Sequence, residues 1–260
     1  MSRFFGRTEV VVCEDNRDLG LKSARAVAQV IRGLLAAKDE ARVVLAAGES
    51  QSSFLNALAR EKGIEWGKIV CFNIDDFWDL RMPEAFTCGM QTRREFYDKV
   101  KAKEVNLVKF DAKDPEAECE RFEKLLREKT IDILCQGIGT SGHLALNEPD
   151  QCAFDDTKWV RLVSLVEQSK KQLIADPNFK ALGYIPEKGI TMTIPAILSA
   201  TRCFTMVPLG LKKNILTRLA AMGKPSTSLP ASILLESPGM LFVDGDSCPD
   251  VWNSNTMVRS

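Results

Sequence analysis

Short apolar runs alternate with longer amphipathic segments along nearly the whole chain. Runs that are apolar at consecutive positions are typical of buried strands, and segments with apolar residues three or four positions apart are typical of covering helices. This pattern predicts strands at residues 10–13, 43–46, 69–72, 105–108, 131–135, 160–163, 190–193, 204–207 and 240–243. It predicts helices at residues 19–35, 52–62, 92–100, 115–129 and 212–222, and a further helix around Ala231.

Strands that alternate with helices predict an α/β fold with a mostly parallel sheet. Because crossover helices cover both faces of such a sheet, we expect a three-layer α/β/α, Rossmann-like architecture. A chain of 260 residues, 45% of them hydrophobic, can bury one large core. We therefore expect a single domain over residues 1–260.

Net charge and the positions of the cysteines argue against several classes of function. The chain has 35 basic and 35 acidic residues, so no long-range field directs it to nucleic acid or to an anionic membrane. Its 8 cysteines are scattered without a C-x-x-C pair, which favours neither a zinc site nor a disulfide framework. Neither a signal peptide nor a membrane span is predicted, because no apolar run is long enough. We expect a cytoplasmic protein that holds any anionic ligand locally.

Three strand ends are the candidate ligand sites, because ligands of open α/β sheets bind beyond the carboxyl ends of the strands. These ends read AAGES (46–50), NIDDF (73–77) and GIGTSGH (137–143). In AAGES, Gly48 allows backbone N–H groups to approach a ligand and Ser50 adds a hydroxyl at a helix start, which fits a phosphate. An ordinary strand-to-helix connection fits the same residues, since neither the Walker lysine pattern nor G-x-G-x-x-G is present.

Adjacent aspartates follow the predicted strand at residues 69–72. The carboxylates of Asp75 and Asp76 repel each other, and the more buried of the two would have a raised pKa, which suits a general base. A helix cap or a turn explains the same pair equally well.

The single histidine of the chain, His143, follows a glycine-rich turn. Gly137 and Gly139 allow tight backbone turns after the predicted strand, and Gly142 frees the position before His143. Glu148 is near enough in sequence to reach the imidazole. A histidine with a carboxylate partner is suited to proton transfer near neutral pH, so we favour a catalytic role over a structural one.

Two lysines complete the candidate site. Lys170 lies in a polar segment, and Lys213 opens a helix after the predicted strand at residues 204–207. Each lysine taken singly is more typical of a solvated surface. Lys213 is the stronger candidate for an anion contact, because it lies at the carboxyl end of a strand.

Five segments occur in an order that resembles the glucosamine-6-phosphate deaminase family, also called glucosamine-6-phosphate isomerase, over nearly the whole chain. They are AAGES, FNIDDFWDL, GIGTSGHLALNEP, GITMTIPAILSA and MVPLGLKK. The segment at residues 137–149 is the most specific. The related 6-phosphogluconolactonases share its G-x-G-x-x-G-H part but usually lack the Asn-Glu-Pro ending. FWDL, the triplet FTC at 86–88 and STSLPASILL resemble the galactosamine-6-phosphate isomerase branch.

The resemblance implies an isomerising deaminase that converts an amino-sugar 6-phosphate to a ketose 6-phosphate and ammonia. It implies that Asp75 moves a proton between C2 and C1 of the open-chain sugar, and that His143, oriented by Glu148, opens the pyranose ring. The implied catalytic residues are Asp75, Ser141, His143 and Glu148, and the implied substrate-binding residues are Gly48, Ser50, Asp76, Gly139, Gly142, Lys170 and Lys213. It implies neither a metal nor an organic cofactor. A homo-oligomer is compatible with the family, although the sequence itself indicates no interface.

Three positions depart from the family pattern. Ser141 stands where the deaminases have aspartate, and Lys170 stands where arginine is expected. Glu49 lies in the phosphate loop, where it would repel a phosphate if it pointed inward. These departures keep two alternatives open: a lactonase-type hydrolase that uses His143 but not Asp75, and a sugar-phosphate-binding protein that has lost catalysis.

Overall fold

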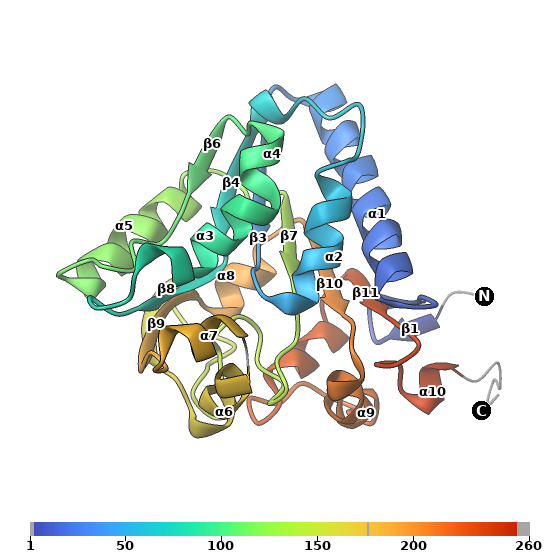
Figure 1. Ribbon diagram of the computed structural model, residues 1–260. Coiled ribbons are helices and arrows are strands. Elements are labelled where there is room, and N and C mark those ends of the chain that lie inside the picture. Colours follow the sequence, from blue (N-terminus) through green and yellow to red (C-terminus); the bar gives the residue numbers. More distant parts are fainter. Residues whose placement is uncertain (1–2, 176, 254–260) are drawn as a thin grey trace.

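The main sheet has eight strands in the order β1-β2-β11-β10-β7-β3-β4-β6 within residues 3–175 and 177–253, which the computed structural model describes (Figure 1). They are β1 (Arg3–Phe5), β2 (Thr8–Val12), β3 (Ala41–Leu45), β4 (Ile69–Asn73), β6 (Glu104–Asn106), β7 (Ile133–Gln136), β10 (Arg202–Val207) and β11 (Gly239–Val243). Every neighbouring pair is parallel except β1 and β2, which form an antiparallel hairpin. The predicted mostly parallel sheet is therefore confirmed.

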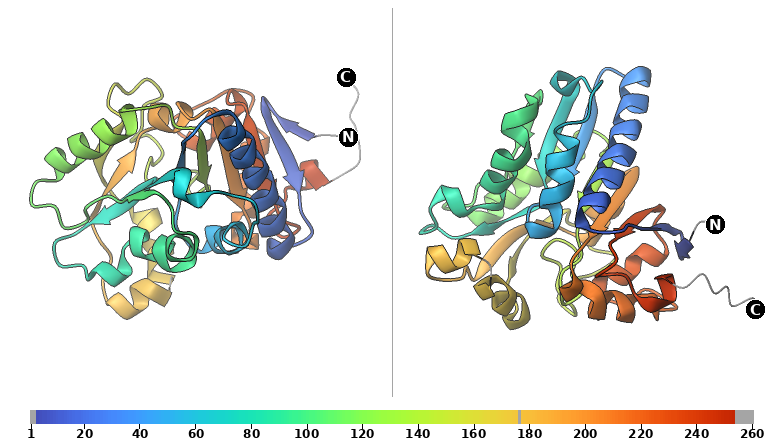
Figure 2. Two further views of the ribbon diagram at one scale, coloured as in Figure 1. Left: turned by 90° about the horizontal axis from the view of Figure 1, so that it is seen from above. Right: turned by 45° about the vertical axis from the view of Figure 1, so that its right-hand side comes forward.

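Side chains of this sheet alternate between its two faces and divide the core in two. In β3, Val43 and Leu45 pack into one core and Val44 into the other. The helices of the first face are α1 (Asn16–Ala37), α2 (Glu49–Leu58), η3 (Arg93–Tyr97) and α4 (Asp98–Val100). Those of the second face are α5 (Pro115–Arg127), α8 (Ile194–Leu198), α9 (Lys213–Ala220) and η5 (Pro230–Leu235). Helices on both sides of the sheet, visible in Figure 2, confirm the three-layer architecture.

Five further helices are short. They are η1 (Trp66–Lys68), η2 (Glu84–Phe86), α3 (Cys88–Thr92), η4 (Gly210–Lys212) and α10 (Asp250–Asn253). Among the long helices, α1 is capped by Asp15, whose carboxylate accepts from the N–H of Asp18 at 2.7 Å. α2 begins at Glu49, earlier than the predicted Ser52, with Gly48 as its N-cap residue. The start of α2 consequently lies directly beyond the carboxyl end of β3.

A second sheet continues from the carboxyl end of β4. It consists of β5 (Asp75–Trp78), β9 (Lys188–Met192) and β8 (Val160–Ser164), paired antiparallel in the order β5-β9-β8. α6 (Glu167–Ala175) and α7 (Pro177–Leu182) lie beside it at the lower left of Figure 1. A small core fixes them there, in which the rings of Phe77 and Phe179 pack edge to face with centroids 5.1 Å apart.

Periodicity did not reveal which sheet a strand joins. Segments 160–163 and 190–193 are strands as predicted, but they belong to the antiparallel sheet. β1 and β5 were not predicted, because both are short and β5 opens with two charged residues instead of an apolar run. The segment around Ala231 is the 3-10 helix η5.

One residue joins the two sheets. The N–H of Ile74 donates to the carbonyl of Leu45 in β3, and the carbonyl of Ile74 accepts from the N–H of Met192 in β9, both at 3.0 Å. Because Ile74 belongs to both hydrogen-bond networks, β5 begins at a fixed place relative to β3 and β4. The two aspartates that open β5 are therefore positioned by sheet pairing.

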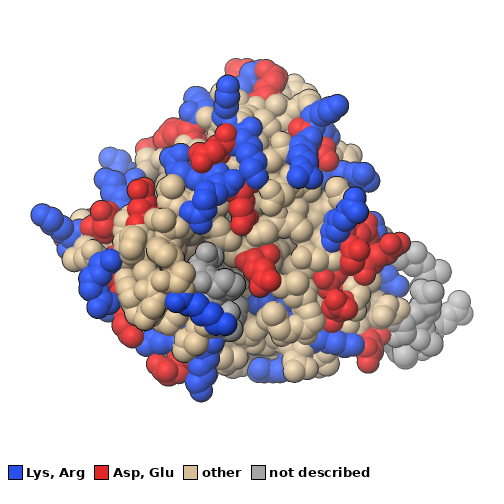
Figure 3. Space-filling view, viewed as in Figure 1, with Lys and Arg blue, Asp and Glu red and all other residues tan. Residues whose placement is uncertain are grey.

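The surface carries no single dominant charge on the face shown in Figure 3, where acidic and basic side chains are interspersed. This mixture agrees with the formal net charge of zero. In the described part of the chain, no helix has the length and the apolar character needed to span a bilayer.

Candidate active site

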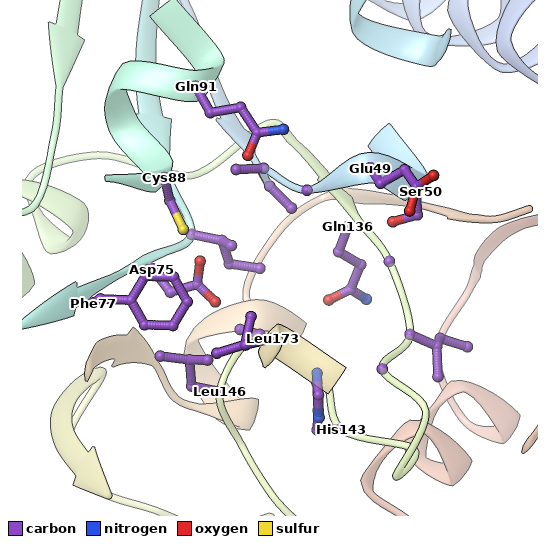
Figure 4. A pocket seen from close by; sticks show the side chains of 18 of the residues that line it. Glu49, Ser50, Asp75, Phe77, Cys88, Gln91, Gln136, His143, Leu146 and Leu173 are labelled. Atoms are coloured by element: carbon purple, nitrogen blue, oxygen red, sulfur yellow. The ribbon is translucent and has the colours of Figure 1, made fainter. Parts of the chain in front are cut away.

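A cavity of about 320 Å³ opens at the carboxyl ends of β3, β4, β7 and β10. The side chains that line it include Glu49, Ser50, Asp75, Phe77, Cys88, Gln91, Arg94, Gln136, His143, Leu146, Leu173 and Lys212. In Figure 4, Asp75 and Cys88 lie on one side of this cavity, Glu49 and Ser50 on the opposite side, and His143 below them. The three strand ends singled out in the sequence therefore meet at one place.

Asp75 is a buried carboxyl that faces the cavity. Its residue is 9% exposed, and no side-chain hydrogen bond to another described residue satisfies it. Burial raises its pKa to about 7, and the neighbouring charge of Asp76 acts in the same direction. Asp75 can therefore gain and lose a proton near neutral pH.

Asp76 points the other way, because successive side chains of β5 alternate. Its carboxylate accepts from the backbone N–H groups of Phe77 at 2.8 Å, Cys88 at 2.9 Å and Gly89 at 2.8 Å, and thereby holds the start of α3. Burial raises the pKa of Asp76 to about 7 as well, although these three donors favour its charged form. Asp75 differs in that its carboxyl lacks such donors among the described residues and lines the cavity. The predicted substrate contact of Asp76 is not supported, since its side chain holds the backbone outside the cavity.

His143 forms a hydrogen-bonded cluster with Glu148. The Nδ1 atom lies 3.1 Å from Glu148 Oε1 and 2.8 Å from Ser141 Oγ. Ser141 also donates to Glu148 Oε2 at 2.7 Å, and Ser169 on α6 donates to Glu148 Oε1. Burial pushes the pKa of Glu148 upward, but the contacts with His143, Ser169 and Ser141 outweigh it and leave the pKa below its ordinary value. Glu148 is therefore a charged partner for the imidazole.

Gly139 and Gly142 are required in this loop for different structural reasons. A Cβ atom on Gly139 would lie 2.0 Å from the ring of His143, so only glycine lets the imidazole rest against the loop at the cavity wall. Gly142 has a φ of +89° and turns the chain before His143, but it does not line the cavity, and a Cβ there would meet Leu229 at 2.2 Å. Gly142 thus shapes the loop, in place of the ligand contact predicted for it.

The opposite side of the cavity holds a buried cation. Gly48, Glu49 and Ser50 line it from the start of α2, whose N–H groups are suited to an anion. Lys212 lines it from the end of η4 and is only 5% exposed. Within the described residues, its ammonium has neither a carboxylate within 4.0 Å nor a hydrogen-bond acceptor. Burial lowers its pKa to about 8, against the opposing effect of Glu49.

Neither predicted lysine lines the cavity. Lys213 pairs with Asp250 at 3.0 Å on the surface, and Lys170 pairs with Glu167 at 3.2 Å and with Glu187. Sequence reasoning missed Lys212, although a signal was present: it precedes the buried Ile215 and Leu216 of α9 by three and four positions. Lys212 therefore lies on the apolar side of the helix start, and Lys213 lies on the solvent side.

No group of three or more histidine, cysteine, aspartate or glutamate side chains that could hold a metal ion occurs in the described part of the chain. The polar groups gathered here instead divide into two sets. Asp75, His143 and Glu148 can move protons, and Lys212 and the start of α2 can hold an anion.

Fold and site thus define an α/β protein whose cavity at the carboxyl ends of the strands brings Asp75, His143 and Lys212 together. Residues 14–243 match the family model described as Glucosamine-6-phosphate isomerases/6-phosphogluconolactonase, and the chain belongs to this family. The resemblance seen in the sequence is thereby confirmed at the level of the family.

Similar proteins match over nearly their full length. The glucosamine-6-phosphate deaminase of Mycoplasmopsis pulmonis is 25% identical over 258 residues, which cover 97% of this chain and 98% of that protein. The one from Halothermothrix orenii is 27% identical, with coverage of 90% and 95%. Among solved structures, a monomeric glucosamine-6-phosphate deaminase superposes with a TM-score of 0.79 at 25% identity, covering 92% of this chain and 98% of that one.

The fold likeness extends to the second branch of the family. The 6-phosphogluconolactonase of Thermotoga maritima superposes with a TM-score of 0.70 at 18% identity, covering 90% of this chain and 98% of that one. At this identity the likeness concerns the fold alone.

Proposed function

We propose that this protein is an isomerising deaminase that converts glucosamine 6-phosphate to fructose 6-phosphate and ammonia. The observation that carries the proposal is that Asp75 and His143, which is bonded to Glu148, line one cavity together with Lys212. Lys212 is buried and has no charged partner among the described residues. Similarity to glucosamine-6-phosphate deaminases over almost the whole chain supports the same activity. The direct test is release of ammonia and ketose 6-phosphate from the amino-sugar 6-phosphate.

Ring opening comes first in the proposed reaction. The imidazole of His143 serves the ring oxygen of the pyranose as C1 becomes an aldehyde, and Glu148 orients the imidazole through its contact with Nδ1. Ser141 lacks the charge of the aspartate usual in the family, but it contacts both His143 and Glu148. The network is therefore continuous despite this substitution.

Proton transfer between carbons follows. The carboxylate of Asp75 takes the proton from C2 and returns it to C1, and a second proton passes from the amino group to O1, so that the open-chain 2-amino aldose becomes a 1-hydroxy ketimine. Water then adds to the C2–N bond, and ammonia leaves as the ketone forms. A base with a pKa of about 7 suits both halves of this transfer, because it accepts and releases a proton at little cost near neutral pH.

The phosphate is held at the opposite side of the cavity. Lys212, the hydroxyl of Ser50 and the N–H groups that open α2 supply its contacts in this proposal. Lys212 thus makes the phosphate contact that the sequence analysis had assigned to Lys170 and Lys213. A charge-assisted contact contributes about 1.5–3 kcal/mol, enough to orient a flexible open-chain sugar against Asp75.

The pH dependence should report the ionisation of Asp75. Since burial raises its pKa, the carboxylate form is lost as the pH falls through about 7, and kcat at saturating substrate should fall about tenfold per unit below that point. Saturation removes effects on binding from the profile. An acidic limb near pH 4, the usual range of an aspartate, would contradict the proposed role.

Acceptance of galactosamine 6-phosphate is a further part of the proposal. Phe77, Thr87 and Cys88 belong to the segments that resemble the galactosamine-6-phosphate isomerase branch, and all three line the cavity. We therefore expect kcat/KM for galactosamine 6-phosphate to equal or exceed that for glucosamine 6-phosphate. A preference of tenfold or more for the gluco epimer would assign the protein to glucosamine 6-phosphate alone.

A further inference from the structure

The phosphate side of the cavity carries a carboxylate as well as an ammonium. Glu49 is the first residue of α2, it is exposed at the cavity wall, and its charge acts on Lys212. Lys170, which could have added a second positive charge, is held by two glutamates outside the cavity. The local charge of these side chains is thus one positive and one negative.

Four other titratable or charged side chains line the cavity besides Glu49 and Lys212. They are Asp75, Cys88, Arg94 and His143. Asp75 and Cys88 lie across the cavity from Glu49 and Ser50, and His143 lies below (Figure 4). Arg94 is exposed, and its guanidinium donates to the carbonyl of Ala85 at 2.9 Å. Lys212 and Arg94 are the lysine and arginine side chains of the described residues that line the cavity, and the Arg94 guanidinium is bonded to Ala85, three residues before Cys88.

A phosphate monoester carries a charge of about −1.5 to −2 at pH 7, because its second pKa is about 6. Its dianion would be repelled by the Glu49 carboxylate and only partly neutralised by a single ammonium. Its monoanion matches Lys212 in charge and retains one O–H group. An O–H donor and a carboxylate acceptor form a short, charge-assisted hydrogen bond.

We propose that this side of the cavity binds the substrate's phosphate as the monoanion, with the remaining phosphate proton donated to the Glu49 carboxylate. The inference rests on the proposed function, because it concerns the phosphate of the same substrate. Glu49 becomes a specificity residue, which favours a distal group that can donate a hydrogen bond over one that cannot, such as a sulfate ester. Binding near neutral pH must then take up a proton from the buffer.

Proton uptake can be measured without turnover. The ligand is the amino-sugar 6-phosphate reduced at C1 to its open-chain polyol, titrated calorimetrically at pH 7.0 in two buffers of different ionisation enthalpy. We expect uptake of about one proton by the parent protein, since most of the free ligand is dianionic there. In Glu49→Gln the uptake should fall by most of that proton. Glu120→Gln, an exposed glutamate on α5 outside the cavity, should match the parent.

Inorganic anions supply the second measurement. Sulfate cannot donate a proton, so Glu49→Gln should strengthen its binding about tenfold at pH 7, whereas phosphate should change less than threefold. Equal proton uptake by parent and Glu49→Gln, or equal strengthening of both anions, would overturn the inference while leaving the deaminase proposal intact. Failure of both proteins to bind the polyol phosphate would overturn the inference and the proposed function together.

Discussion

Replacement of Asp75 by asparagine is expected to lower kcat for deamination by about 10²–10⁴-fold, because asparagine cannot accept the C2 proton. The same substitution should not destabilise the fold. Burial disfavours the charged form of Asp75 and raises its pKa to about 7, above an unfolded value near 3.9. The parent should therefore lose stability as the pH rises from about 4 to 7, and Asp75→Asn should show a smaller loss, since only the contribution of Asp76 remains. Steady-state kinetics and thermal unfolding at pH 4, 5 and 8 measure both effects.

The matched control is Asp76→Asn, the same chemical change one residue along. Asp76 accepts three backbone N–H groups, and an asparagine amide nitrogen cannot replace a carboxylate oxygen as acceptor. We expect a loss of about 1–3 kcal/mol in the free energy of unfolding. An Asp75→Asn variant that kept most of its activity would argue for the lactonase-type alternative, which needs His143 and water but not this base.

Replacement of Lys212 by methionine should raise KM about 10- to 100-fold with a smaller effect on kcat, because one charge-assisted phosphate contact is lost. The unliganded protein should become more stable. Burial of the ammonium lowers its pKa to about 8, below an unfolded value near 10.4, so the cost of this charge is fully present below pH 8 and disappears as the pH rises through 10.4. The gain in melting temperature should follow the same pH dependence.

Lys213→Met is the control for that experiment. Lys213 lies next in the chain and pairs with Asp250 at the surface, so KM and melting temperature should both stay close to those of the parent. Lys170→Met should also leave KM within about threefold, since its ammonium is held by glutamates outside the cavity. A large rise in KM for Lys213→Met or Lys170→Met, but not for Lys212→Met, would assign the anion contact as the sequence had done.

The main sheet could be predicted because each of its buried strands is apolar at consecutive positions and is followed by an amphipathic helix. β5 could not, because its signal lies in pairing with β9, which is distant in the chain. The position around the helix axis determines which of Lys212 and Lys213 faces the cavity. The spacing from Lys212 to Ile215 and Leu216 was readable in the sequence, but placing Lys213 at a helix start did not take the apolar side of that helix into account.

The orientation of Asp75 and Asp76 could not be predicted from their spacing in the sequence. Adjacent carboxylates at a strand end predicted one raised pKa, but spacing alone did not decide which residue faced the ligand, and only the family resemblance favoured Asp75. The alternation of side chains along a strand places Asp75 toward the cavity and Asp76 away from it, but this argument requires knowing that residues 75–78 form a strand. The contact of Ser141 with both His143 and Glu148 was likewise inaccessible, because a hydroxyl can turn toward many partners.

The single-residue link at Ile74 constrains how this chain can vary. Its backbone is bonded to β3 on one side and to β9 on the other, so nothing there can absorb a change in length. Insertion or deletion of one residue before β5 would exchange the orientations of Asp75 and Asp76. The carboxylate with three N–H partners would then turn toward the sugar, and the start of α3 would be left without its acceptor. Gaps in alignments of related chains should therefore avoid this junction and gather in the surface loops.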